Sequence, residues 1–395
     1  MLYYLSRRRL PSDGDDVTQV QKMANSIQKL RMCQGFAAND EEVCYVCPRN
    51  GEKEPSWESL SEYYGLSSEF DIRTVPAPDT NHNFPLIPDT DDQSLLAWLL
   101  YAYASGVFDE GDIIYTRTLQ PARYFLQIRE WLGGDDDISF WFEQHQIERD
   151  IDGPILDKDF YKQMDGLVCI SEKQKEAMVE AHPIDREKIY VHHDGVDLRS
   201  YENWTKTGAR EDLGMELNED IVMYTGHLYP EKDVETLVKA AKHFEEQCII
   251  VGGYPDDISR IKSNITVPDN VTFTGFVPPS EIPLYQTAAD VLVATVGANN
   301  DTDYFSPLKL FEYMAAGKPM VVSRKPEFEE ILSHQESALM VKPESVSEMA
   351  EAINRCLDDA NLGMQLGQRA RERVDQYDWR VRAQNILTDI RTRRM

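Results

Sequence analysis

The sequence predicts two doubly wound α/β domains, each built on a parallel sheet with helices on both faces. Short apolar runs alternate with helical patterns over almost the whole chain, which is typical of such sheets. The alternation pauses near residue 198 and restarts near residue 221, so two sheets account for it better than one. A length of 395 residues gives room for two cores of ordinary size.

The first domain is expected over residues 1–198. Its predicted strands are the apolar runs at 2–5, 43–47, 71–75, 112–115, 138–142, 166–170 and 188–192. The second of these runs contains Cys44 and Cys47. On a strand, two thiols at this spacing point to opposite faces, which suits neither a metal site nor a redox loop. We therefore interpret both as core cysteines.

The second domain is expected over residues 199–376. Six further apolar runs predict its strands, at 221–225, 248–252, 271–275, 290–295, 319–323 and 338–341, and helical patterns predict helices at 232–245, 307–316, 345–358 and 361–373. The turn Asp194-Gly195-Val196-Asp197 and the polar stretch 199–212 indicate an exit turn and a linker. Residues 377–395 follow as a C-terminal helix, which either packs back across the hinge or lies on the surface.

The charge balance limits the partners of the chain. There are 69 Asp and Glu against 41 Lys and Arg, a net charge of -28, so nucleic acid or an anionic membrane would be bound only through a local basic patch. The acidity is spread from end to end, which favours a surface adapted to a high-salt cytosol over one acidic partner site. An ordinary acidic enzyme is the alternative. No signal peptide or membrane span is apparent, so a cytoplasmic location is expected.

The most informative stretch runs from Tyr304 to Pro319. It indicates a loop, a helix that begins near Ser306-Pro307, a stop at Gly317 and then a buried strand. Ligands of open sheets bind beyond the carboxyl ends of the strands, and a helix N-terminus there favours phosphate. Glu312, about one and a half turns into the helix, could accept hydrogen bonds from the hydroxyls of a ribose. A surface Glu on an amphipathic helix is the alternative.

This stretch resembles the donor-binding motif of the family 4 glycosyltransferases, which are retaining enzymes of the GT-B fold. Other segments are similar to elements of the same family, in the same order: 24–28 running into 42–43, 193–197, 224–232, 270–277 and 288–291. The resemblance implies two Rossmann-like domains that face each other across a cleft, with acceptor bound by the first and donor by the second. It also implies hexosyl transfer, without a metal, from a UDP- or GDP-sugar to a hydroxyl of a glycan or lipid-linked glycan.

The resemblance also implies roles for single residues. Lys232 would hold the diphosphate, Glu312 the donor ribose, and His145 would contact the donor sugar from the acceptor side. The implied donor-binding residues are Gly226, His227, Lys232, Phe305, Ser306, Pro307, Leu308, Lys309 and Glu312. The chemistry is consistent, because a fixed Lys and a helix N-terminus stabilise the charge that grows on a departing nucleoside diphosphate.

Acceptor contacts are expected near the end of the first strand. Arg7, Arg8 and Arg9 follow that strand directly, and Asn25 lies in the segment 24–28 that resembles the family's first helix. We hypothesise that the three arginines meet an acceptor phosphate or the inner face of the membrane. Three solvated loop arginines are the alternative.

Two positions depart from the family pattern and keep other functions open. Tyr304 stands where the first Glu of a Glu-x7-Glu pair is expected, and His227 stands where many members have Arg. A non-catalytic nucleotide-sugar-binding partner of another transferase, or a sugar-nucleotide epimerase or hydrolase on this fold, therefore remains possible. Asp-x-Asp triplets at 13–15, 89–91 and 301–303 leave open a metal-dependent transferase of the other large fold. Dehydrogenases and NTPases are disfavoured, because no glycine-rich phosphate motif follows the first strand.

Overall fold

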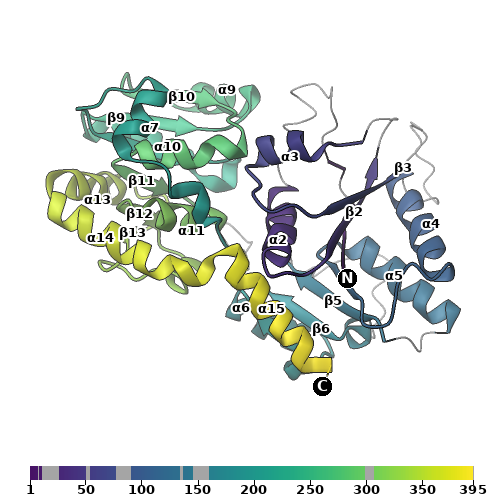
Figure 1. Ribbon diagram of the computed structural model, residues 1–395. Coiled ribbons are helices and arrows are strands. Elements are labelled where there is room, and N and C mark those ends of the chain that lie inside the picture. Colours follow the sequence, from purple (N-terminus) through teal and green to yellow (C-terminus); the bar gives the residue numbers. More distant parts are fainter. Residues whose placement is uncertain are drawn as a thin grey trace. The chain divides into compact units, whose positions relative to one another are not determined.

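Figure 1 shows the computed structural model, which describes residues 1–7, 9–10, 26–49, 54–76, 90–133, 137–145, 160–298 and 307–394. The chain divides into two compact units. One consists of Met1–His193 together with Trp379–Met395, and the other of Asp194–Asp378. The division therefore falls after His193 rather than after residue 198, and the C-terminal helix is part of the first unit. At this point Val196 donates a backbone hydrogen bond to Tyr377, which ties the exit turn to the end of the second unit.

The first unit contains a seven-stranded parallel sheet, in the order β3-β2-β1-β4-β5-β6-β7. Its strands lie close to the predicted runs, at Leu2–Leu5 (β1), Val43–Arg49 (β2), Asp71–Pro76 (β3), Ile113–Thr116 (β4), Ser139–Gln144 (β5), Gly166–Cys169 (β6) and Ile189–Val191 (β7). The order reverses between β1 and β4, as in doubly wound sheets, so the predicted fold class is confirmed.

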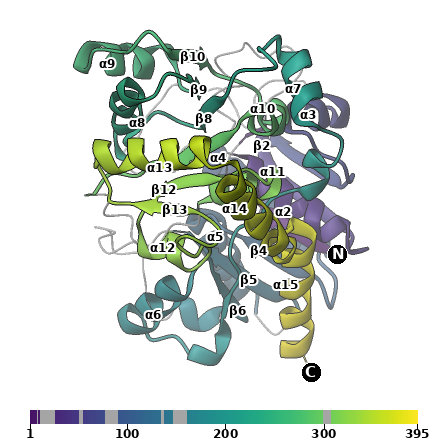
Figure 2. The ribbon, with the colours of Figure 1, turned by 90° about the vertical axis from the view of Figure 1, so that its left-hand side faces the viewer.

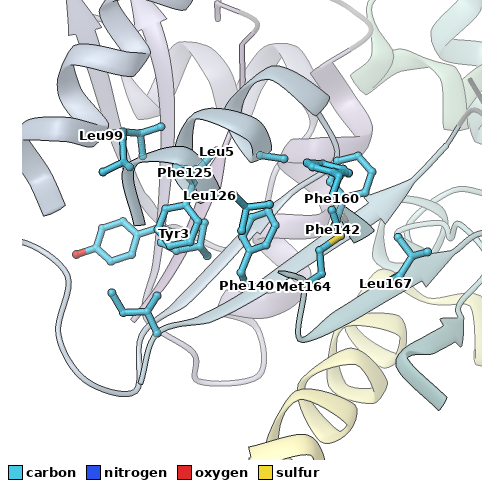
Figure 3. Packing of buried hydrophobic residues seen from close by; sticks show 14 of the residues in the cluster. Tyr3, Leu5, Leu99, Phe125, Leu126, Phe140, Phe142, Phe160, Met164 and Leu167 are labelled. Carbon is cyan, nitrogen blue, oxygen red and sulfur yellow. The ribbon is translucent and has the colours of Figure 1, made fainter. Parts of the chain in front are cut away.

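Helices cover both faces of this sheet, at Ile27–Ala37 (α2), Trp57–Tyr64 (α3), Thr90–Ala104 (α4), Leu119–Leu132 (α5), Glu172–Ala181 (α6) and Trp379–Arg394 (α15). Because strand side chains alternate, each strand supplies both faces. On one face Phe140 of β5 stacks on Phe125 of α5 (Figure 3). On the other, Tyr4 of β1 packs beside Tyr115 of β4, which contacts α2 through its Phe36.

The second unit contains a six-stranded parallel sheet, in the order β10-β9-β8-β11-β12-β13. The strands are Ile221–Thr225 (β8), Gln247–Val251 (β9), Val271–Gly275 (β10), Val291–Ala294 (β11), Met320–Ser323 (β12) and Leu339–Val341 (β13). The larger helices are Lys206–Leu213 (α7), Val234–Ala240 (α8), Pro255–Asn264 (α9), Ile282–Ala288 (α10), Leu308–Ala316 (α11), Val346–Asp358 (α13) and Ala360–Arg373 (α14). Helix α13 lies over β11, β12 and β13 (Figure 2).

Two helix predictions in this unit were wrong. The stretch predicted to be a linker contains the helix α7. Arg210 of this helix is only 1% exposed and binds Asp290 and the Ala288 carbonyl oxygen, so these contacts anchor a polar helix to the rest of the unit. The predicted helix 232–245 is broken into α8 and short flanking 3₁₀ turns. Asp233, immediately before α8, has a φ of 50°, which an α-helix does not accommodate.

Cys44 and Cys47 are both buried in β2, as expected of core thiols. Among the helices of the described ranges, none is long and apolar enough to cross a membrane.

Candidate functional site

Glycines bring the carboxyl ends of β8 and β9 close together in the second unit. Gly226 directly follows β8 and Gly252 directly follows β9, with φ values of 134° and 107°. A Cβ on Gly252 would lie 2.4 Å from the Gly226 carbonyl oxygen, so no larger residue fits there. Gly226 and Gly252 thus form a surface of backbone atoms without side chains, here called the glycine shelf. It lies at the carboxyl edge of the sheet, where parallel sheets bind ligands.

Lys309 reaches this shelf from the first turn of α11. Its Nζ lies 3.5 Å from the centre of the Tyr224 ring and would lie 3.2 Å from a Cβ on Gly226. Burial lowers the pKa of Lys309 well below its usual 10.5, the positive charge of Lys232 lowers it further, and Glu312 opposes both. The ammonium is therefore held beside the glycine by an aromatic face.

Lys232 approaches from the loop after β8. It ends the 3₁₀ turn Pro230–Lys232, and its carbonyl oxygen accepts a hydrogen bond of 2.6 Å from Thr295, which follows β11. Burial lowers the pKa of Lys232, and Glu231 opposes this effect. In a chain of net charge -28, two lysines with lowered pKa values at one sheet edge mark a place that an anion would stabilise.

His227 lies between the two lysines and a row of aromatic rings. Burial lowers its pKa, Lys309 and Lys232 lower it further, and Asp257 opposes them. Its ring stacks on Tyr229 at 4.9 Å between centroids, and Tyr254 and Phe276 continue the row from the loops after β9 and β10. The imidazole is consequently neutral where an Arg would carry a full charge.

A hydrogen-bonded network fixes Glu312 on α11. The Gln286 amide nitrogen lies 2.9 Å from Glu312 Oε2 and 3.0 Å from Thr225 Oγ1, and donates to both. Gln286 is fully buried, and its amide oxygen accepts from the Tyr201 hydroxyl at 2.5 Å. The Glu312 carboxylate is thus held in one orientation.

Tyr313 joins α11 to the strands below it. Its hydroxyl accepts a hydrogen bond of 3.0 Å from the Thr225 backbone nitrogen and donates to the Val293 carbonyl oxygen at 3.2 Å. This contact aligns α11 with β8 and β11, so that Lys309 and Glu312 face the glycine shelf together.

The loop that carries His227 is fixed from below by α9. Arg260 pairs with Glu235 and donates a hydrogen bond to the Leu228 carbonyl oxygen. A Cβ on Gly253 would lie 2.3 Å from Leu228 Cδ1, so this leucine fills the space that the glycine leaves.

In the first unit, His145 directly follows β5. Glu143, two residues earlier, lies on the same face of the strand and bonds to His145 Nε2. The Glu143 carboxylate is 2% exposed and also accepts from the Tyr115 hydroxyl at 2.5 Å and from Arg382 Nη1 at 3.0 Å. Burial opposes ionisation, yet Arg382 and His145 hold the pKa of Glu143 well below its usual range.

Of the four predicted acceptor-side residues, the structure describes Arg7 and Arg9. Arg7 Nε lies 2.8 Å from Asp92 Oδ1, a buried carboxylate on α4, so this arginine must change partner to meet a phosphate. Arg9 is half-buried. Arg8 and Asn25 lie outside the described residues, as do Tyr304, Phe305 and Ser306.

At the second unit's sheet edge, the structure brings together seven of the predicted site residues: Gly226, His227, Lys232, Pro307, Leu308, Lys309 and Glu312. Pro307 precedes α11, and Leu308 begins it. Sequence reasoning missed Gln286, Tyr201 and the stacked rings of Tyr229 and Tyr254. Gln286, Tyr201 and Tyr254 belong to no recognisable spacing, because each comes from a different loop or helix. Tyr229 lies within the segment 224–232, but nothing in that segment indicated that it stacks on His227.

The two parallel sheets define a protein of the GT-B fold, with two Rossmann-like domains. A transferase of the other large fold does not fit two separate sheets, so that alternative was wrong. The Asp-x-Asp triplets at 13–15 and 301–303, which raised it, lie outside the described residues. HepE of Anabaena, in complex with UDP and glucose, is similar over 99% of both chains with a TM-score of 0.69 and 17% identity. Sucrose-phosphate synthase of Thermosynechococcus elongatus is similar over 99% of this chain and 98% of its own, with a TM-score of 0.70 and 20% identity.

Residues 205–373 match the sequence model of the family Glycosyl transferases group 1. A D-inositol 3-phosphate glycosyltransferase of Nocardia farcinica is 25% identical over 247 residues, 59% of this chain and 54% of the relative. A GDP-mannose-dependent alpha-(1-6)-phosphatidylinositol monomannoside mannosyltransferase of Mycobacterium tuberculosis is 29% identical over 181 residues, 43% of this chain and 47% of the relative. The chain thus spans about half the length of these curated relatives. Together these likenesses show the GT-B fold, and the match to the family model lies within the second unit.

Proposed function

We propose that the chain is a retaining, family 4 type glycosyltransferase that transfers a hexose from a nucleoside diphosphate sugar to a hydroxyl group. The observation that carries the proposal is the pair Lys232 and Lys309. Two ammonium groups of lowered pKa lie at the carboxyl edge of the second sheet, where α11 also presents its N-terminus. A diphosphate relieves their mutual repulsion and restores their charged forms.

In this proposal Glu312 holds the donor ribose, and the backbone around Pro307 and Leu308 contacts phosphate. The acceptor hydroxyl oxygen bonds to the anomeric carbon as the sugar–phosphate bond breaks, and the proton of that hydroxyl passes to the departing phosphate oxygen. The nucleoside diphosphate leaves with the electron pair of that bond. Lys232, Lys309 and the α11 N-terminus stabilise the charge that develops on it, so the residues present supply this stabilisation without a metal.

The acceptor is proposed to be a glycan or a lipid-linked glycan, as in polysaccharide synthesis at the cytoplasmic face of a membrane. Support comes from two relatives, which are named for an inositol 3-phosphate and for a phosphatidylinositol monomannoside. His145 is proposed to contact the donor sugar from the acceptor side. The acidic composition supports a halophilic prokaryote as the source.

The test is a thermal-shift and calorimetric screen in high KCl against UDP, GDP, ADP and their sugars, with and without Mg²⁺. A ligand that binds the native state raises its melting temperature. One nucleoside diphosphate that stabilises the protein without Mg²⁺ is the expected result, and it identifies the base. Stabilisation that requires Mg²⁺ contradicts the metal-independent mechanism, and no response to the whole panel contradicts the donor site.

A non-catalytic nucleotide-sugar-binding partner is the second candidate. It is favoured by Tyr304 in place of an expected Glu and by the lowered pKa of His227, where many family members have Arg. Such a protein binds donor but never turns it over with any acceptor. An epimerase or hydrolase on this fold instead rearranges or releases the sugar with no acceptor present, so product analysis without acceptor separates the three.

A further inference from the structure

The carboxyl edge of the first sheet contains a buried carboxylate that receives donors from three elements. Tyr115 comes from β4, His145 follows β5, and Arg382 comes from α15. Glu143 itself is almost fully buried. A buried carboxylate is costly unless it is paired and hydrogen-bonded, so this arrangement is either a structural anchor or part of the site.

The electrostatic surroundings decide the ionisation state of Glu143. Burial acts to raise its pKa, but the charges of Arg382 and Arg117 and the hydrogen bond from His145 lower it well below its usual range. The hydroxyls of Tyr4 and Tyr115 face it from β1 and β4, and burial raises the pKa of both phenols, so they remain neutral. Glu143 is consequently ionised and can only accept hydrogen bonds.

The ionised carboxylate fixes the tautomer of the histidine. Since Glu143 accepts from His145 Nε2, that nitrogen must carry the hydrogen. In the neutral ring the lone pair is then on Nδ1, which becomes the acceptor nitrogen. A ring in the opposite tautomer would present a donor at Nδ1 and would not match a donating sugar hydroxyl.

Arg382 offsets the cost of burying the charged Glu143 carboxylate. Its side chain is 2% exposed, and it donates to the carbonyl oxygens of His193 at 2.8 Å and His192 at 3.2 Å, besides Glu143. These three oxygen acceptors, together with Met32 Sδ at 2.7 Å from Nη1, hold the guanidinium in one orientation. It offsets the charge of Glu143 while leaving the second carboxylate oxygen to His145.

We propose that Glu143, with its charge offset by Arg382 of α15, is a positioning residue that holds His145 in the Nε2–H form, so that Nδ1 accepts a hydrogen bond from a sugar hydroxyl. This inference rests on the proposed function, in which His145 faces the sugar. It adds two residues, Glu143 and Arg382, that no recognisable motif of the sequence pointed to.

The experiment compares two carboxylate-to-amide variants of the full chain. In Glu143→Gln the amide oxygen can keep accepting from Arg382 and Tyr115, so the amide NH2 group takes the place of the oxygen that accepts from His145. Asp389→Asn is the matched control, because Asp389 on α15 binds His192 Nε2 at 2.7 Å in a second histidine–carboxylate pair of the same unit. Ring ¹⁵N chemical shifts of the labelled protein report the tautomer of His145, and steady-state kinetics report kcat and the donor KM.

In the wild type we expect the Nε2–H form, and in Glu143→Gln a mixture of tautomers. The kcat of that variant should fall at least about tenfold while the donor KM changes less than about threefold, because a wrong tautomer affects the reacting complex more than donor binding. Asp389→Asn should keep both the His145 tautomer and kcat. An unchanged tautomer in Glu143→Gln, or an equal loss of kcat in both variants, overturns the proposal.

A second variant and the ¹⁵N measurement cover the cases in which Glu143→Gln does not fold or the wild type is inactive. If Glu143→Gln does not fold, Glu143→Asp keeps the charge but withdraws it by one methylene, and the same tautomer mixture is expected. If the wild type transfers no sugar from any donor, the proposed function fails on its own. The ¹⁵N measurement still decides whether Glu143 holds the histidine.

Discussion

Lys232 and Lys309 show how the charge of single residues is tuned at the sheet edge. Each ammonium is partly removed from water, and each lies close enough to influence other charged groups there. The two lysines are nevertheless not equivalent. Lys309 packs on Tyr224, whereas Lys232 ends a turn whose carbonyl is fixed by Thr295. The side chain of Lys309 is thus fixed by an aromatic ring, whereas the backbone of Lys232 is fixed by a hydrogen bond.

Replacing Lys232 should therefore impair turnover and spare the fold. We expect Lys232→Ala to lower kcat by more than about tenfold, because a charge that stabilises the departing diphosphate is lost. Lys239→Ala is the control, since Lys239 is exposed on α8 in the same segment. Kinetics and a melting curve on both variants suffice. A near-normal rate in Lys232→Ala would remove this lysine from the site.

The lowered pKa of Lys309 predicts proton uptake on ligand binding. Burial and Lys232 favour its neutral form in the free protein, and a bound diphosphate favours the charged form. Between the free and the bound pKa, binding takes up protons, so nucleotide affinity falls as pH rises toward 10.5. In the same range the unfolded chain holds more protons than the folded one, so this lysine's contribution to stability increases with pH.

Calorimetry in two buffers of different ionisation enthalpy measures this uptake. The apparent binding enthalpy should differ between the buffers, and the difference should shrink in Lys309→Met. Identical enthalpies at every pH up to 10.5 would contradict the assignment of Lys309 to the site.

At the scale of elements, the strand ends of the second unit are held at a distance that glycine alone permits. Gly252 meets the Gly226 carbonyl oxygen, while Gly275 ends β10 with a φ of 76°. The backbone amide of Gly252 also donates to Gly275. Three consecutive strand ends of the sheet, β8, β9 and β10, are thus linked through backbone atoms, and the loops that carry the aromatic row start from them.

Gly252→Ala should destabilise the protein more than a glycine replacement in an open position. Gly214 is the matched control, because its φ of 64° is also positive but nothing lies within 4 Å of an added Cβ. We expect Gly214→Ala to cost about 1 kcal/mol from backbone strain and Gly252→Ala at least about 2 kcal/mol, since the carbonyl of Gly226 must also shift. Melting temperatures of the two variants give the comparison. Equal losses of stability in the two variants would contradict this prediction, because they would show that the Gly226 carbonyl shifts at little cost.

The sequence predicts elements that are buried and regular, and fails for elements that are fixed by polar contacts. The apolar runs located every strand of both sheets to within a few residues, because buried parallel strands are nearly continuous in hydrophobicity. Helix α7 was missed, since its stability comes from the buried Arg210 and not from an apolar face. Lys232 and Glu312 were visible through spacing within one segment. Gln286 and Arg382 were not, because their partners are distant in sequence.

At the scale of the whole molecule, the excess of acidic side chains is the dominant property of the surface. A net charge of -28 makes the chain repel itself, and salt reduces that repulsion over a Debye length of about 10 Å at 0.1 M and 3 Å at 1 M. Stability should consequently depend on the salt concentration.

We expect the melting temperature to fall as KCl is withdrawn from molar concentration. The measurement is a thermal melt at constant pH over a KCl series, with a series of uncharged osmolyte as the control for non-ionic stabilisation. A melting temperature that does not change with the KCl concentration would contradict a surface adapted to high salt and would favour an ordinary acidic enzyme.

The first unit is discontinuous, because Trp379–Met395 completes a body that begins at Met1. Residues 379–394 are also synthesised after the whole of the second unit. During translation the second unit can therefore fold first, while Glu143 still lacks the guanidinium of Arg382. A buried carboxylate without its cation is strongly unfavourable. We therefore expect the carboxyl edge of the first sheet, and with it the position of His145, to become ordered only after α15 has left the ribosome.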